Sequence, residues 1–439
     1  MLHRYPKDLV EKLVLLWQKP LPAKLRKTDI AHDLPDQAVL EDLVSTCYQV
    51  SLMKEEARGL RFRVMLCEPE VFLGEGFRKY RELFILPFSE RRPYNVYEVI
   101  KLGPATDFNN SIIGIRLDQQ EGLQIWGFIH SGSRWTHAIH GGSKQPTPLP
   151  PALALHVTGP GRLTACRGLE ILAQLAGGNI ISPSANVFKS HWMNERFSRV
   201  QMQLAAKHEN DPLHDRSRWA RIAPAFVTTL YLEFFKHVIS TVRRSGHGGT
   251  IISLPAGMED MISHRNPYIS LKYSFGADGP RTQLQNLVLE IMQIVAVSCG
   301  KRHGPGYVAG WRDYVQLQKE ELTQLDELIF KFARFAARLT GVDGAVVTTE
   351  EPELVGFGGI IQGSFEMGDT VARALDPEGK RRRTEKIEGV GTRHRSLYAL
   401  CERLHNALGI VVSQDAEVQV VTWKNDMVTC WDVIPIDFS

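Results

Sequence analysis

The chain has 439 residues, of which 43% are hydrophobic and 23% charged. This composition excludes wholesale disorder and a fibrous repeat, and it predicts two or three globular domains. The 52 lysines and arginines nearly balance the 49 acidic residues, so we expect neither nucleic acid nor a membrane surface as a partner. No stretch has the length of a membrane span, and the six cysteines lack zinc-type spacing. We therefore expect a cytoplasmic protein with buried thiols.

The N-terminal part of the chain combines helices with short strands. Residues 1–50 have helical periodicity and form an expected N-terminal helical segment. Residues 61–131 alternate apolar and polar positions over strand lengths, which predicts a mostly antiparallel sheet. A hairpin is expected over residues 154–168, and helices return over about 194–240. These patterns predict an α+β region over residues 51–275.

The C-terminal part alternates helices and strands. A strongly amphipathic helix is expected over residues 319–341, before an apolar strand at 343–349. Further along, the pattern predicts a strand, a long polar insert, a helix and two last strands, at residues 354–361, 362–390, 396–409, 410–414 and 417–423. The predicted fold class is mixed α/β, with a mixed sheet flanked by helices over residues 276–439.

Two turns in different parts of the sequence resemble each other. Residues 246–253 (GHGGTIIS) and 341–348 (GVDGAVVT) each follow a helix with a basic last turn and lead into an apolar strand. One interpretation is that helix-to-strand turns look alike in general. The other is that the N-terminal region contains a second strand-and-helix unit without the carboxylate, since Gly248 stands where Asp343 would be.

The residues with chemical potential are concentrated in the C-terminal third. Asp343 lies between a helix end and an apolar strand, where a carboxylate either binds a partner such as a metal or caps a turn. Residues 391–396 (GTRHRS) open a helix, and unsatisfied N–H groups and the positive dipole end make such a helix start suitable for an anion. Phosphate is one candidate anion; ion pairs with Glu385 or Glu388 are the alternative. Ser413, at a strand end, is a further candidate phosphate contact.

These motifs together carry a resemblance. DGA at 343–345 and GTRHR at 391–395, followed by a helix and IVVSQ at 410–414, resemble the diadenylate cyclase domain of DNA-integrity-scanning and membrane-bound cyclic di-AMP synthases. The order of the motifs makes the resemblance specific, and it covers a core of about residues 312–439. It implies a nucleotidyltransferase that condenses two ATP molecules into the second messenger cyclic di-AMP. It also implies Mg²⁺ or Mn²⁺ as cofactor and a homodimer or larger even homo-oligomer with facing sites.

The resemblance implies roles for individual residues. The implied catalytic residues are Asp343, Arg393 and His394, and the implied metal ligands are Asp343, His394 and Asp415. The implied nucleotide-binding residues are Gly344, Ala345, Gly359, Ile361, Gly391, Thr392, Arg395, Ser396 and Ser413. Phosphoryl transfer depends mainly on positioning and on neutralising negative charge, which arginines and metals supply.

The sequence also departs from the family pattern. Residues 362–390 are longer than the equivalent loop and carry the basic run Lys380–Arg383, so this insert is expected either to gate the site or to block the facing arrangement. The first 275 residues resemble the N-terminal regions of bacterial proteins in which a sensor region is fused to a diadenylate-cyclase-like domain. The leading hypothesis is therefore a bacterial diadenylate cyclase under sensor control. The alternative is a non-catalytic nucleotide-binding receptor in stress or phage-defence signalling. The intact Asp343, Arg393 and His394 favour the enzyme, and the insert favours the receptor.

Overall fold

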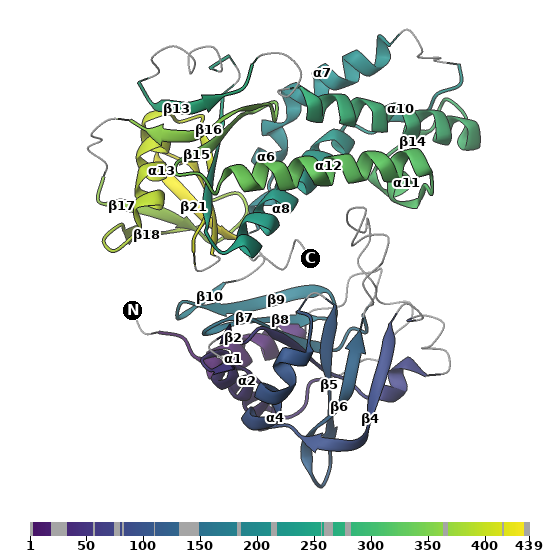
Figure 1. Ribbon diagram of the computed structural model, residues 1–439, viewed down its shortest axis with the longest axis vertical. Helices are drawn as coiled ribbons and strands as arrows, with labels where there is room; N and C mark the ends of the chain where they lie inside the picture. Colours follow the sequence, from purple (N-terminus) through teal and green to yellow (C-terminus); the bar gives the residue numbers. More distant parts are fainter. Residues whose placement is uncertain are drawn as a thin grey trace. The chain divides into compact units, whose positions relative to one another are not determined.

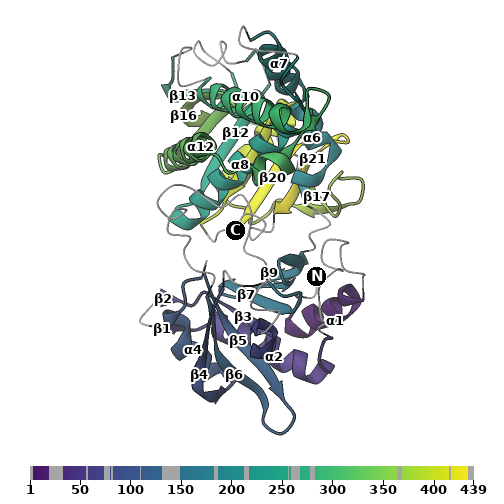
Figure 2. The same ribbon diagram turned by 90° about the vertical axis from the view of Figure 1, so that its right-hand side faces the viewer.

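The computed structural model places the chain in two compact units, each built on a large sheet (Figures 1 and 2). The residues that the structure describes are 3–18, 33–55, 58–73, 80, 83–108, 110–130, 149–181, 186–211, 217–255, 257–258, 267–276, 282–362, 368–414 and 417–433. The mixed α/β class is confirmed. The division of the chain differs from the predicted ranges, because the first unit ends near residue 183 and residues 186–275 fold with the C-terminal unit.

The first unit contains the predicted N-terminal helices and the predicted sheet. Its helices are α1 Pro6–Trp17, α2 Gln37–Ser51 and α4 Val96–Leu102, with 3₁₀ turns at Pro69–Phe72 and Gly103–Ala105. Its strands are β1 Lys54–Glu55, β2 Arg58–Gly59, β3 Phe62–Leu66, β4 Phe84–Pro93, β5 Ser111–Asp118, β6 Gly122–His130, β7 Leu153–Gly159, β8 Arg162–Arg167, β9 Glu170–Ala176 and β10 Asn179–Ile181.

The helices of residues 1–50 are not a separate segment, because they complete the core of this sheet. Eight strands pair in the order β10-β9-β8-β7-β3-β5-β6-β4, antiparallel except for β3 with β5. Leu13 of α1 and Leu43 of α2 are fully buried in one cluster with Phe62 and Ile113 from the sheet. The mostly antiparallel sheet and the hairpin β7–β8 are confirmed.

A row of polar side chains crosses four neighbouring strands of this sheet. Arg63 pairs in register with His156, His156 with Thr164, and Thr164 with Gln174. All four are buried, and the Gln174 amide donates to Thr164 Oγ1 at 2.8 Å. His156 Nε2 has no hydrogen-bond partner. Burial and the neighbouring Arg63 charge lower the pKa of His156 to about 3, so the ring stays neutral in the folded chain at neutral pH.

Because the folded-state pKa of His156 lies below its ordinary value of 6.5, the unfolded chain binds the extra proton first as the pH falls. The free energy of unfolding should therefore decrease between about pH 6.5 and pH 3, and the contribution is fully present above that range. We expect His156→Gln to flatten this slope in urea titrations at a series of pH values. The control is Thr164→Val, which removes a polar neighbour in the same row that has no titratable group and should keep the wild-type slope. An unchanged slope in His156→Gln would show that another group titrates.

The second unit contains the motif residues. Its helices are α6 His191–Arg196, α7 Ser198–Glu209, α8 Ala225–Ser245, α10 Gln283–His303, α11 Trp311–Gln316, α12 Glu320–Leu339 and α13 Thr392–Arg403, with a 3₁₀ turn at Val187–Lys189. Its strands are β11 Arg221–Ile222, β12 Gly249–Leu254, β13 Ile269–Ser274, β14 Val308–Ala309, β15 Ala345–Thr349, β16 Leu354–Ile361, β17 Thr370–Ala374, β18 Arg382–Lys386, β19 Leu408–Val412, β20 Val418–Lys424 and β21 Met427–Val433.

The nine-stranded sheet of this unit is covered by helices on both faces. Its order is β13-β16-β15-β12-β19-β20-β21-β17-β18. Side chains on one face share a hydrophobic core with helices α6, α7, α8, α10 and α12, and α13 lies on the other face (Figure 1). Alternate residues of a strand point to opposite faces, so Ile251 joins the first cluster and Ile252 the second. This burial on both faces explains the uninterrupted apolar run of β12.

The two similar turns precede neighbouring strands of this one sheet. β12 lies beside β15, parallel to it, with Thr250 paired to Ala345 and Ser253 to Thr348. Each strand follows a long helix, α8 or α12, and the two helices meet through the stacked rings of Phe234 and Phe332, 5.7 Å apart. The two similar turns therefore take equivalent positions in one sheet of the second unit, and they do not belong to a separate unit in an N-terminal region.

Two further expectations need correction. The helix expected over residues 396–409 runs from Thr392 to Arg403, because residues 408–412 instead form β19 between β12 and β20. In the insert, residues 368–390 are described, and they contain the antiparallel hairpin β17–β18. This hairpin extends the sheet, since β17 pairs in parallel with β21.

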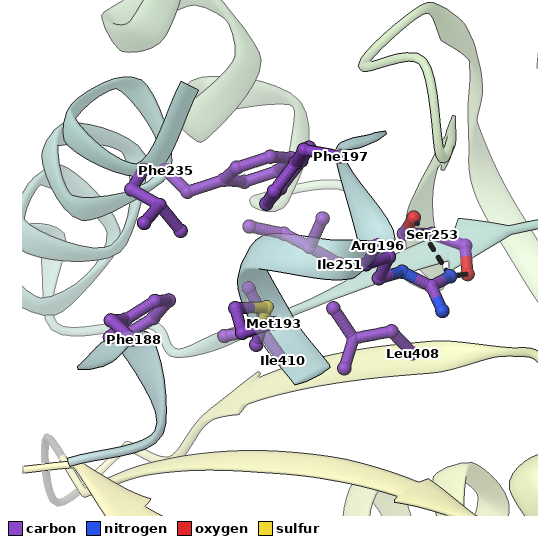
Figure 3. Close-up of a pocket in the computed structure, with 10 residues that line it drawn as sticks. Phe188, Met193, Arg196, Phe197, Phe235, Ile251, Ser253, Leu408 and Ile410 are labelled. Carbon is purple, nitrogen blue, oxygen red and sulfur yellow. Dashed lines mark hydrogen bonds between the residues drawn. The ribbon is translucent and has the colours of Figure 1, made fainter. Parts of the chain in front are cut away.

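The opposite end of the sheet from the motifs is anchored by Arg196 of α6 (Figure 3). Its guanidinium donates to the Ser253 carbonyl at 3.1 Å and pairs with Glu350 at 3.2 Å. The surrounding apolar side chains leave a cavity of about 10 Å³, too small for more than a water molecule. Arg196 therefore stabilises the packing of α6 against β12.

We expect Arg196→Ala to lower the free energy of unfolding by about 1.5–3 kcal/mol, because it removes charge-assisted hydrogen bonds from a largely buried guanidinium. Arg199→Ala is the control: Arg199 pairs with Glu351 at 3.2 Å but is 64% exposed, so its loss should cost at most about 1 kcal/mol. Urea unfolding of both variants measures the difference. Equal losses would contradict the assigned anchor.

Candidate functional site

The motif residues meet at one end of the nine-stranded sheet. β12, β15 and β20 begin at this end, because β12 is parallel to β15 and antiparallel to β19, which is in turn antiparallel to β20. β16 and β19 finish here, with Gly359 opposite Ala345 and Val412 opposite Gly249. The DGA turn (residues 343–345), the HGG turn (residues 247–249) and Ser413 are thus gathered by strand direction, although they are far apart in the sequence.

A cavity of about 610 Å³ lies at the start of α13. We call it the α13 pocket. It is lined by residues of α13, the end of β19, the start of β20 and the insert: Arg373, Gly389, Val390, Gly391, Thr392, Arg393, His394, Tyr398, Ser413, Gln414, Glu417 and Gln419. Gly391 is the N-cap of α13 and supplies no side-chain cap. The His394 N–H donates to the Gly391 carbonyl at 3.1 Å, which leaves the N–H groups of Thr392 and Arg393 to serve an anion at this helix start.

The HGG turn holds Arg393 in place. Arg393 Nη1 donates to the His247 carbonyl at 3.0 Å. Gly248 has φ +66°, and a Cβ there would lie 2.6 Å from the Val412 carbonyl oxygen and 2.7 Å from Arg393 Nη1. A side chain at this position would therefore displace Arg393. Glycine is favoured at position 248 both because a side chain would clash and because the backbone has a positive φ.

His394 faces both signs of charge in the α13 pocket. Burial lowers its pKa, Glu417 and Asp432 oppose that change, and Arg373 and Arg393 reinforce it. The net direction is downward, so the ring is predominantly neutral at pH 7. A neutral imidazole can accept a hydrogen bond or bind a metal.

Arg373, on β17, is held by two carboxylates. Its Nε donates to Glu385 at 2.7 Å, and one Nη donates to Asp432. Asp432 in turn accepts from the Gln419 amide at 3.0 Å, and Gln419 accepts from the Tyr398 hydroxyl at 2.9 Å. Burial opposes the charge on Arg373, but Asp432 and Glu385 outweigh it and raise its pKa. The guanidinium is therefore a fixed cation at the pocket wall.

The DGA turn lies at the same end of the sheet but outside the α13 pocket. Asp343 is exposed and is not among the described residues that line that pocket. Gly344 has φ +112°, and a Cβ there would lie 2.7 Å from the Gly358 carbonyl carbon and 2.9 Å from Gly359 N. The turn therefore packs directly on the backbone of β16, and Gly344 has no room for a side chain.

The remaining predicted site residues divide between these two places. Gly391, Thr392 and Ser413 line the α13 pocket with Arg393 and His394. Ala345, Gly359 and Ile361 lie on β15 and β16 beside the DGA turn. Arg395 and Ser396 are not among the residues that line the pocket: Arg395 is exposed, and the Ser396 hydroxyl donates to the Thr392 carbonyl at 3.0 Å. Asp415 lies outside the described residues.

A metal site made by the protein alone is not visible in the described part of the chain, where no group of three or more His, Cys, Asp or Glu side chains is suitably placed. Mg²⁺ commonly keeps several waters and binds through one or two carboxylates together with substrate phosphates. An exposed Asp343 fits that kind of shared site. It does not fit a closed structural site.

Several residues of this site were not predicted from the sequence. The similarity of the HGG turn to the DGA turn was visible in the sequence. Its contact with Arg393 was not, because that contact depends on the strand order of the sheet. Arg373, Glu417 and Gln419 had no motif, and Arg373 lay in an insert expected to gate or obstruct.

Elsewhere, all six cysteines are free and buried, as expected. Within the described residues, every helix is too short or too polar to cross a bilayer.

Comparison with known proteins concerns the first unit. No curated protein and no solved structure matches the chain. Residues 29–130 match a family model described as "Probable sensor domain DACNV", which spans α2 to β6. This match supports the predicted sensor region and places α2 within it rather than in a separate helical segment.

Proposed function

We propose that the chain is a diadenylate cyclase, which condenses two ATP molecules into cyclic di-AMP and two pyrophosphates under control of its N-terminal sensor region. The observation that carries this proposal is the α13 pocket. It brings Arg393, His394 and Ser413 to a helix start that suits a polyphosphate. The reaction itself is inferred from the order of the motifs, which resembles that of the diadenylate cyclase family.

The reaction joins two nucleotides head to tail. The 3′-oxygen of each ATP attacks the α-phosphorus of the other, a new P–O bond forms, and the bond between the α- and β-phosphates breaks. Pyrophosphate leaves with the electron pair of that bond, and the 3′-hydroxyl proton is released. Arg393 and the first turn of α13 are placed to neutralise the negative charge that develops on the phosphates. No covalent enzyme intermediate is required.

Asp343 is proposed to act on the attacking hydroxyl. Its exposed position beside β16, outside the α13 pocket, suits contact with a ribose rather than with the polyphosphate of the same nucleotide. Asp343, with His394 as a second candidate ligand, would hold a divalent ion, Mg²⁺ or Mn²⁺, and that ion would supply Lewis-acid polarisation.

The proposal includes a facing pair of chains. Because two bonds form between two nucleotides, one polyphosphate pocket per chain cannot complete the ring by itself. A symmetric dimer or a larger even assembly provides two such pockets across one cleft. The match to a sensor-domain family at residues 29–130 agrees with an enzyme whose activity is controlled through its N-terminal unit.

The decisive experiment is incubation of purified full-length protein with ATP and Mn²⁺ or Mg²⁺, with products identified by mass spectrometry. Cyclic di-AMP and pyrophosphate are expected, and heat-denatured protein is the control. Recovery of unchanged ATP that is nevertheless bound, measured by calorimetry, would overturn the cyclase and favour the nucleotide-receptor alternative. A different nucleotide product would overturn both.

A further inference from the structure

We infer that Arg373, carried by the insert hairpin β17–β18, is a further polyphosphate-binding residue of the α13 pocket. This inference rests on the proposed function as far as that function requires ATP to bind there. It assigns the insert a direct part in substrate binding, instead of a role as a gate or an obstruction.

The hairpin places Arg373 by regular strand pairing. β17 pairs with β18 on one side, with Arg373 opposite Arg383, and with β21 on the other, with Arg373 opposite Cys430. Strand β17 is therefore part of the sheet rather than a free loop. Together with Gly389 and Val390, which also belong to the insert, Arg373 lines the α13 pocket.

The ion pairs of Arg373 orient its guanidinium without using all of it. Glu385 takes Nε and Asp432 takes one Nη, and an arginine has further N–H donors beyond these two bonds. Within the described part of the chain, the pocket lining includes Arg373 but neither of its carboxylate partners. Of Arg373, Glu385 and Asp432, the Arg373 guanidinium is therefore the group that faces a ligand in the pocket.

The carboxylates themselves are held in place. Gln419 donates to Asp432 at 3.0 Å and is fixed by the Tyr398 hydroxyl at 2.9 Å. Glu385 keeps its own bond to Arg373 Nε, at 2.7 Å. Such a network fixes the geometry of Arg373 before a ligand arrives, and a prepositioned guanidinium loses little conformational entropy on binding.

The arrangement gives the pocket two cations on different elements. Arg393 comes from α13 and is tied to the HGG turn, whereas Arg373 comes from β17. A group that carries several negative charges can contact both together with the first turn of α13. A nucleoside triphosphate has this chemistry, and a nucleoside without phosphate does not.

The test compares two arginines of the same hairpin. Arg373 and Arg383 both bind Glu385, but Arg373 lines the pocket and Arg383 is absent from its described lining. Full-length wild type, Arg373→Ala and Arg383→Ala are titrated calorimetrically with ATP and with adenosine, without divalent metal so that no turnover occurs. We expect ATP affinity to fall at least about tenfold in Arg373→Ala and to change less than about twofold in Arg383→Ala. Adenosine affinity should be equal in all three proteins.

Arg373→Lys adds a further readout. It retains the charge but loses the two-pronged geometry, so its ATP affinity should lie between those of wild type and Arg373→Ala. Equal losses of ATP affinity in Arg373→Ala and Arg383→Ala would overturn the inference, because the effect would then come from the shared Glu385. A parallel loss of adenosine affinity in Arg373→Ala would also overturn it, since that would report collapse of the pocket.

The outcomes remain separable from those of the proposed reaction. Cyclic di-AMP formation by wild type with normal ATP affinity in Arg373→Ala would refute the role of Arg373 alone. Binding that depends on Arg373, without any cyclic di-AMP, would refute the cyclase and keep the inference.

Discussion

Asp343→Asn should reduce cyclic di-AMP formation by at least about 10²-fold while ATP binding remains close to that of wild type. The substitution removes one negative charge but little volume. Asp343 is exposed and lies outside the α13 pocket, so the fold and the polyphosphate contacts should persist. In the proposed reaction the lost charge would bind the metal and help to activate the 3′-hydroxyl, which affects turnover rather than affinity.

The measurement pairs initial rates of cyclic di-AMP release with calorimetric ATP titration. Glu388→Gln is a suitable control, because it neutralises another exposed carboxylate next to Gly389 of the pocket lining. It should retain wild-type turnover. Undiminished turnover in Asp343→Asn would remove Asp343 from the reaction, and a comparable loss in Glu388→Gln would indicate a general effect of surface charge.

Dilution should produce the second large effect. If two chains must face each other, the specific activity should fall toward zero as the protein is diluted below the dissociation constant of the dimer. Each ring closure needs two polyphosphate sites, and the described chain offers one α13 pocket with this set of motif residues. Activity per chain that stays constant across dilution, in a protein shown to be monomeric by light scattering, would contradict the facing arrangement.

Mixing inactive and active chains tests the same arrangement independently. In an equal mixture of wild type and Asp343→Asn that associates at random, about one quarter of the dimers contain two wild-type chains. Activity per wild-type chain should therefore fall to about half if mixed dimers make no cyclic product. A linear dinucleotide intermediate from mixed dimers would agree with one functional half-site. A decline that only follows the fraction of added inactive chains would support independent monomers.

The regular elements followed from local sequence patterns. The amphipathic period of residues 319–341 predicted α12, and the alternating residues within 61–131 predicted the sheet that contains β5 and β6. Such patterns report which side chains can be buried on one face, and this depends on residues close together in the chain. The order of the DGA and GTRHR motifs likewise pointed to the condensation of two ATP molecules. Analysis of the products formed from ATP tests that hypothesis.

Long-range pairing decided what local patterns did not contain. The boundary expected at residue 275 is displaced because β12 pairs between β15 and β19, a contact between segments about a hundred or more residues apart. The helix expected to continue to residue 409 stops at Arg403 for a similar reason, since Leu408–Val412 gain two strand partners. Helical periodicity could not anticipate that competition.

The sequence by itself determined the mixed α/β class, most of the helices and strands, and the anion-suited start of α13. Only the tertiary structure decided that the HGG turn supports Arg393, that Asp343 lies outside the pocket, and that Arg373 of the insert lines it. The physical reason is the geometry of a sheet. Strand order and direction determine which chain ends share an edge, and these depend on pairing between distant segments rather than on the residues of any one motif.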